Sequence, residues 1–285
     1  MDIALREGLI EVAGSLPTYA SVGVEHRAQA IGRIAASSYE YLAQLLRRRP
    51  EIQILVLSEA DWATKGRAAL FGLPNAGEGT LVVAGTEAPW WTDLAEMAPD
   101  HAKAEINRVY AGSDGVLSLA RFFDLVAVHE VGHVFCGGVV RFPRLWLGEL
   151  FANLALHAWV AERAPEHLAT LVTLPRLAAQ SPGTQFECRT RDEFEQHYTS
   201  MGGPNYVWYE FRLQAEAARL FDLAGSGVVR RLFEAFRTRT AATVDETDEM
   251  ATESSWHDAE LDDAVLADRL AAVVDPTLGE FSLAF

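Results

Sequence analysis

The chain has 285 residues, of which 24 are basic and 40 acidic, giving a formal net charge of −16 at pH 7. Hydrophobic residues make up 49% of the sequence and charged residues 22%, a balance typical of a globular chain with one sizeable core or two lobes around a cleft. The negative charge argues against nucleic acid or an anionic membrane as a main partner, and mildly favours basic or neutral substrates.

Targeting signals are not recognisable in the sequence. The N-terminus carries Asp2 and Glu7 where a signal peptide has basic residues, and no apolar segment of the required kind follows. No stretch approaches the roughly 18 apolar residues of a membrane span. Cys136 and Cys188 are too few for a disulfide framework. We therefore expect a cytoplasmic protein.

The first third of the chain predicts a long helix followed by two strands. Apolar residues recur at helical spacing over 25–49, and Pro50 stops the helix. The continuous apolar run 52–57 predicts a buried strand, and 80–84 predicts a second one between glycines. Residues 86–118 are expected to be irregular, and the pair Trp90-Trp91 within them either covers a core or, less often, walls a substrate cleft.

The central feature is an apolar helical segment that contains H-E-x-x-H at His129, Glu130 and His133. Residues four apart lie one turn above each other on a helix, so the two imidazoles can aim at one point. A Glu buried between two His is costly unless something pairs with it, and a metal ion does so. We interpret the motif as part of a catalytic zinc site, with Glu130 as the general base.

A second apolar helix is predicted at about 146–159. Glu149, Asn153 and His157 are four apart from one another and share one stripe on it. Glu149 lies 16 residues after His133, which is enough for the chain to leave the first helix, turn and return antiparallel. His157 is expected to be a hydrogen-bonded core residue rather than a fourth ligand.

These residues resemble the motifs of the zincin metallopeptidases, and within them the gluzincin branch. Metzincins carry a third histidine, which is missing after His133, whereas gluzincins take a glutamate from the next helix, the place that Glu149 occupies. The resemblance implies one Zn²⁺ ion per chain, bound by His129, His133 and Glu149. Asn153 stands where the family has an aspartate that orients a ligand histidine.

The resemblance also implies an α+β, zincin-like fold. An N-terminal lobe at 1–122 would hold the long helix and a small sheet, and 123–243 would hold the active-site helix and a mostly helical lobe, with the metal cleft between them. An acidic segment and a C-terminal helix are expected at 244–285. Zincins bind the substrate backbone along an edge strand, and 80–84 is either that strand or an ordinary strand of the sheet.

In many gluzincins, a tyrosine at the start of a downstream helix donates a hydrogen bond to the oxyanion that forms at the metal. A helix is predicted to open at Gly202-Gly203 and continue through Phe221, with Tyr206 and Tyr209 in its first turns. We favour Tyr206 and keep Tyr209 as the alternative. His197, in the loop before this helix, is a further candidate.

The sequence thus predicts a zinc-dependent metallopeptidase that acts on a peptide or protein substrate. The substrate motifs G-x-M-E-N of gluzincin aminopeptidases and N-E-x-x-S-D of thermolysin-like enzymes are absent, so the resemblance names neither the substrate nor the mode of cleavage. The competing hypothesis is a non-catalytic zincin-fold protein that binds metal or peptide as a regulatory module. The presence of both histidines, Glu130 and Glu149 counts against it.

Overall fold

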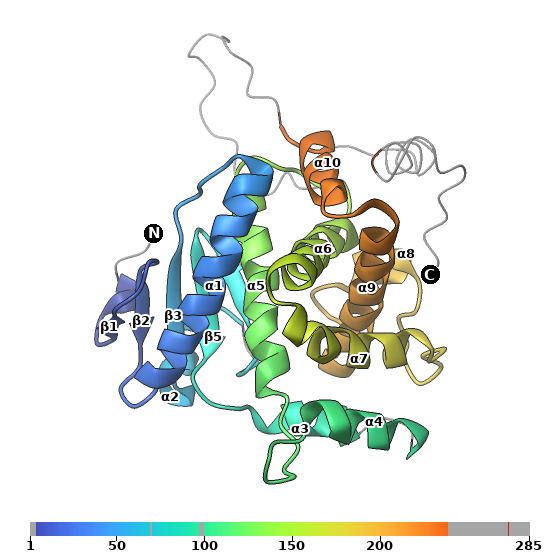
Figure 1. Cartoon of the computed structure of the whole chain (residues 1–285), viewed down its shortest axis with the longest axis horizontal. Coiled ribbons are helices and arrows are strands. Elements are labelled where there is room, and N and C mark those ends of the chain that lie inside the picture. Colours follow the sequence, from blue (N-terminus) through green and yellow to red (C-terminus); the bar gives the residue numbers. More distant parts are fainter. Residues whose placement is uncertain (1–3, 69, 97–99, 239–272, 274–285) are drawn as a thin grey trace.

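The computed structural model describes residues 4–68, 70–96, 100–238 and 273. This part of the chain has a mixed α+β architecture, with a small sheet on one side and a group of helices on the other (Figure 1). The acidic segment and most of the C-terminal helix expected at 244–285 lie outside these residues. None of the helices within the described ranges has the length and hydropathy needed to span a membrane.

The sheet has five strands in the order β1-β2-β3-β5-β4. β3 is parallel to both of its neighbours, whereas β1 and β4 pair antiparallel at the two edges. All residues of β3 and β5 are buried, as expected of central strands rich in β-branched and apolar residues. The strand bounds are β1 (Ile10–Val12), β2 (Thr18–Ala20), β3 (Gln53–Leu57), β4 (Asn75–Gly77) and β5 (Thr80–Ala84).

The strands predicted at 52–57 and 80–84 are confirmed, and of the two alternatives for 80–84 the structure shows an ordinary internal strand of the sheet, not the edge strand. The edge strand next to β5 is β4. It was not predicted from the sequence because it is short and contains no β-branched residue. A tight turn through Glu78 (φ 49°) and Gly79 (φ 73°) joins it to β5. Two successive positive φ angles are what a two-residue hairpin turn requires. The apolar strand is therefore enclosed, and a polar, glycine-containing strand takes the edge.

The long helix α1 (Glu25–Leu46) connects β2 to β3 and packs against the sheet and against α5 (Ala120–Cys136). It ends three residues earlier than predicted. Arg48, which follows it, donates hydrogen bonds to the backbone oxygens of Phe135 and Gly137 at the end of α5. Arg48 thus caps the C-terminus of the neighbouring helix, where unpaired carbonyls favour a cation.

The expectation of an irregular segment at 86–118 is wrong, because α3 (Pro89–Glu96) and α4 (Asp100–Tyr110) form there. Proline fits the first position of a helix, where no backbone N–H is needed. Trp91 is buried and stacks on Phe123 with ring centroids 4.3 Å apart, while Trp90 packs edge-on against the same ring. The tryptophan pair therefore covers the core, the commoner of its two expected uses.

Apart from the short helix α2, the remaining helices lie in the second half of the described chain. α5 and α6 are buried on nearly all sides, and α6 packs against both α5 and α9 (Figure 1). This triple packing brings residues from three separate stretches of sequence to one place. The bounds are α2 (Glu59–Lys65), α6 (Leu145–Arg163), α7 (Leu168–Ala179), α8 (Arg191–His197), α9 (Gly203–Ala224) and α10 (Gly227–Ala235), with short 3-10 turns at Ala4–Arg6 and Pro165–His167.

Candidate metal centre

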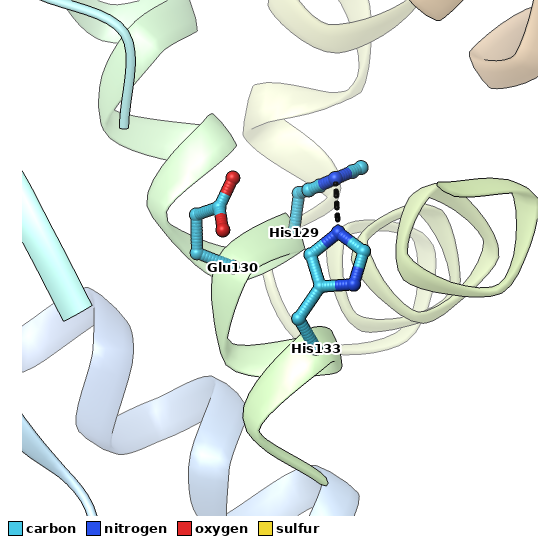
Figure 2. Close-up of side chains that lie close together, drawn as sticks. All are labelled: His129, Glu130 and His133. Carbon is cyan, nitrogen blue, oxygen red and sulfur yellow. Dashed lines mark hydrogen bonds between the residues drawn. The ribbon is translucent and has the colours of Figure 1, made fainter. Parts of the chain in front are cut away.

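His129, His133 and Glu149 converge on one point between α5 and α6. Glu149 Oε2 lies 3.0 Å from His129 Nε2 and 3.1 Å from His133 Nε2, and the two ring nitrogens are 3.0 Å apart. The three atoms form a nearly equilateral triangle. Figure 2 shows the two imidazoles meeting from successive turns of α5, with Glu130 beside them. The structure therefore brings together the three ligands expected from the sequence.

The close approach of the two helices depends on Gly132, which lies inside the motif. A Cβ atom at this position would lie 3.1 Å from the Cα of Ala152 and 3.5 Å from the Cβ of Ala155. Such distances leave little or no room for a larger side chain. Small residues on both helices therefore set the distance at which Glu149 faces the histidines.

A chain of hydrogen bonds fixes the ring of His129. Its Nδ1 lies 3.0 Å from Asn153 Oδ1, and Asn153 Nδ2 donates to Glu210 Oε2 at 3.0 Å. Since the Asn153 amide nitrogen donates to Glu210, its oxygen accepts from His129, and Nδ1 of that ring carries the proton. A neutral His129 consequently points the lone pair of Nε2 at the Glu149 carboxylate.

A lone pair facing a carboxylate is unfavourable unless a proton or a cation lies between them. Burial by itself lowers the pKa of His129, but the hydrogen bond to Glu149 and the charges of Glu130 and Glu149 outweigh it and raise this pKa to about 10. The site therefore attracts positive charge strongly. A metal ion satisfies both nitrogens and the carboxylate oxygen at once, so the residues fit a metal.

Glu130 is 8% exposed and belongs to the same cluster. Burial raises the pKa of its carboxyl, while His133, His129 and a backbone hydrogen bond from Ala76 in β4 lower it. The edge strand thus lies directly against the residue expected to act as the general base. Glu130 is not one of the three residues of the triangle. It lines a cavity beside the triangle, together with His129 and residues of α9.

The structure separates the two candidate tyrosines. Tyr206 lines the same cavity as His129 and Glu130, and burial together with the charges of Glu149 and Glu210 raises the pKa of its phenol. The hydroxyl of Tyr209 instead donates to the backbone oxygen of Thr190. Tyr209 is therefore corrected from a candidate catalytic residue to a core residue.

Neither of the other two histidines considered reaches the triangle. His197 lies exposed at the end of α8. His157 is 4% exposed, with Nδ1 3.4 Å from Gln214 Nε2 and its ring against Phe221. It is a buried residue with a polar partner, as expected.

Two functional residues escaped the sequence analysis. Tyr198 donates a hydrogen bond to the second oxygen of Glu149, Oε1, at 2.8 Å. Glu210 accepts a hydrogen bond from Asn153 and so places a second carboxyl group behind His129. The signal for Glu210 was present, because Tyr206, Glu210 and Gln214 are four apart and form a polar stripe on α9, like the stripe on α6.

No protein-family model, curated protein or solved structure matches the chain. The nature of the site is therefore inferred from its geometry. Besides the triangle, two overlapping groups among the described residues have ligand atoms within 4.8 Å of one another: His129 with Glu130 and His133, and His129 with Glu149 and Glu210. The triangle with sides of 3.0–3.1 Å is tighter than either group, so we take it as the metal-binding set.

Proposed function

We propose that the protein is a zinc-dependent metallopeptidase of the gluzincin type. The observation that carries this proposal is the convergence of His129, His133 and Glu149, with Asn153 holding the proton of His129 on the far side of its ring. Two imidazole nitrogens and one carboxylate oxygen form the donor set of many catalytic zinc sites, which keep a fourth position open. The buried setting and the fixed ring orientation support the same assignment.

A zinc ion bound here would make water acidic enough to serve as a nucleophile at neutral pH and would polarise a peptide carbonyl. Glu130 is placed to take the proton from the attacking water and to deliver it to the leaving amine. The hydroxyl of Tyr206 can donate to the oxygen that becomes negative. Tyr198 fixes Glu149, and Asn153 fixes His129, so both ligands keep their orientation.

The competing function is a regulatory module that binds metal or peptide without catalysis. It predicts that the metal triangle is intact and that Glu130 is dispensable. The position of Glu130 on the wall of a cavity, rather than packed in an apolar core, favours the enzyme.

The decisive experiment compares zinc content and peptide-library cleavage for the wild type, Glu130→Gln and Glu166→Gln. Glu166 is the matched control, because its side chain is 69% exposed and lies outside the site. We expect about one zinc per chain in all three proteins. Cleavage should fall by about 10²-fold or more in Glu130→Gln alone, as for the loss of a general base.

Three results would contradict the proposal. A wild-type protein that binds no zinc would remove the metal centre. Zinc binding without cleavage of any library peptide would favour the regulatory module. Cleavage that persists in Glu130→Gln would show that another group activates the water.

A further inference from the structure

The cavity beside the metal triangle has apolar walls and a polar end. It extends from His129 and Glu130 to α9, with a volume of about 580 Å³ when the part open to solvent is included. At the polar end lie Glu210 and Gln214, one turn apart on α9. The walls are formed by apolar side chains: Leu73, Pro74, Phe122, Phe123, Val126 and Phe211, among others.

Two oxygen atoms at this end have no hydrogen-bond partner among the described residues. Glu210 uses Oε2 to accept from Asn153, but its Oε1 is buried and unpaired. Gln214 Oε1 is also buried and unpaired. Unsatisfied acceptors in an apolar cavity are unfavourable, and so they favour a ligand that brings N–H or O–H groups to them.

The ionisable group at this end of the cavity is the carboxyl of Glu210. No Lys or Arg is found among the residues that line the cavity. The charged groups that favour ionisation of Glu210 are His129 and His133, and the nitrogens of both point at Glu149. Burial and the charge of Glu149 raise the pKa of Glu210 to about 8, so a cationic ligand at Oε1 would pair with this carboxyl and favour its ionised form.

We propose that this cavity is a substrate subsite for a cationic side chain, that of lysine or arginine, in a peptide. The apolar walls would hold the aliphatic stem, and Glu210 Oε1 and Gln214 Oε1 would accept hydrogen bonds from the charged head. The chain's net charge of −16 favours the approach of basic peptides. This inference depends on the proposed peptidase function, because the subsite is placed beside the same metal centre.

The first test is binding, which does not require catalysis. Calorimetry on the zinc-loaded protein at pH 7 would compare pentylammonium, which mimics the end of lysine, with pentanol, which has a similar stem and no charge. We expect pentylammonium to bind at least 10-fold more tightly. The advantage should vanish in Glu210→Gln and shrink in Gln214→Met, but persist in the matched control Asp222→Asn, on the exposed face of the same helix.

Gln214→Met keeps the test decisive if Glu210→Gln loses zinc or stability, because Gln214 is not linked to Asn153. Equal binding of the two probes by the wild type would overturn the inference. So would an ammonium preference that survives in both Glu210→Gln and Gln214→Met.

The second test uses peptides with blocked N-termini that differ only in having lysine or norleucine at one position. We expect kcat/KM to be at least 10-fold higher for lysine at the preferred position. Equal cleavage of both peptides would overturn the subsite and leave the peptidase function standing. No cleavage of either, with the binding preference intact, would count against the peptidase and not against the cation pocket. A preference seen only with free N-termini would overturn the side-chain assignment and assign the pocket to a terminal amine.

Discussion

The surroundings of His129 and of His133 differ sharply, although the two residues lie one turn apart in the same motif. The side chain of His129 is 6% exposed, and its second nitrogen is held by Asn153. The side chain of His133 is 30% exposed, and its Nε2 contacts His129 and Glu149. His129 is thus held by contacts with three helices, whereas His133 is held by the backbone of α5 and by its contacts with His129 and Glu149.

Because of this difference, the two histidines should contribute similarly to metal binding but differently to the stability of the fold. Metal binding needs both nitrogens, because a site with an open position has few ligands to spare. Folding depends on His129 more than on His133, because the hydrogen-bond chain from His129 through Asn153 to Glu210 joins α5, α6 and α9 in the interior. Variants of His129 and of His133 should therefore weaken zinc binding to a similar extent but lower the free energy of unfolding by different amounts.

The largest expected effect is that of replacing either histidine by alanine. His129→Ala and His133→Ala should each weaken zinc binding by more than the 10–100-fold typical of residues behind the ligands. Without zinc, His129→Ala should lower the free energy of unfolding by about 1–3 kcal/mol more than His133→Ala, because it leaves Asn153 buried with an unpaired oxygen. Chelator competition measures the first quantity, and urea unfolding with excess chelator the second. Equal destabilisation by the two variants would contradict the comparison.

A smaller effect on zinc binding is expected from replacing the residues that hydrogen-bond to His129 and to Glu149. Asn153→Ala should weaken zinc binding by about 10–100-fold, since the ring of His129 then loses the partner that fixes its orientation. Tyr198→Phe removes one neutral hydrogen bond from Glu149, worth about 0.5–1.5 kcal/mol, and should weaken zinc binding by about 10-fold or less. Metal-buffer titrations of both variants give the order directly. A stronger effect for Tyr198→Phe would show that Glu149, not His129, is the ligand most dependent on support.

The triangle was predictable because its information is local. The spacing of His129 and His133 fixes them on one face of a helix, and the position of Glu149 follows from a second helix that returns antiparallel. The supporting residues depend on how distant segments cross. Tyr198 lies in the chain between α8 and α9, and Glu210 reaches the site because α9 packs on α6.

The sheet shows the same limit from another direction. The apolar strands at 52–57 and 80–84 were readable from composition alone, whereas β4 is three residues long and polar enough to resemble a loop. Whether a strand lies at an edge depends on its partners, which a local pattern does not contain. Likewise, the sequence favoured Tyr206 but kept Tyr209 as an alternative, and the hydrogen bond from the Tyr209 hydroxyl to Thr190 separates the two.

The smallest expected effect concerns His157, a buried histidine of α6 that lies away from the triangle formed by His129, His133 and Glu149. Burial lowers its pKa below the ordinary value of 6.5, and the charge of Asp222 opposes this only partly. The unfolded chain therefore binds a proton at this residue before the folded protein does, so the contribution of His157 to stability is constant above pH 6.5 and falls as the pH drops below it. His157→Gln keeps a polar group of similar size next to Gln214 and removes the titration. Between pH 7.5 and 5, the wild type should lose more unfolding free energy than this variant, by at most about 1.4 kcal/mol per pH unit. Both proteins keep the same metal-site residues, so the difference between their unfolding free energies, measured in urea as a function of pH, reports on His157 alone. Parallel pH profiles would show that burying His157 does not lower its pKa enough to affect stability.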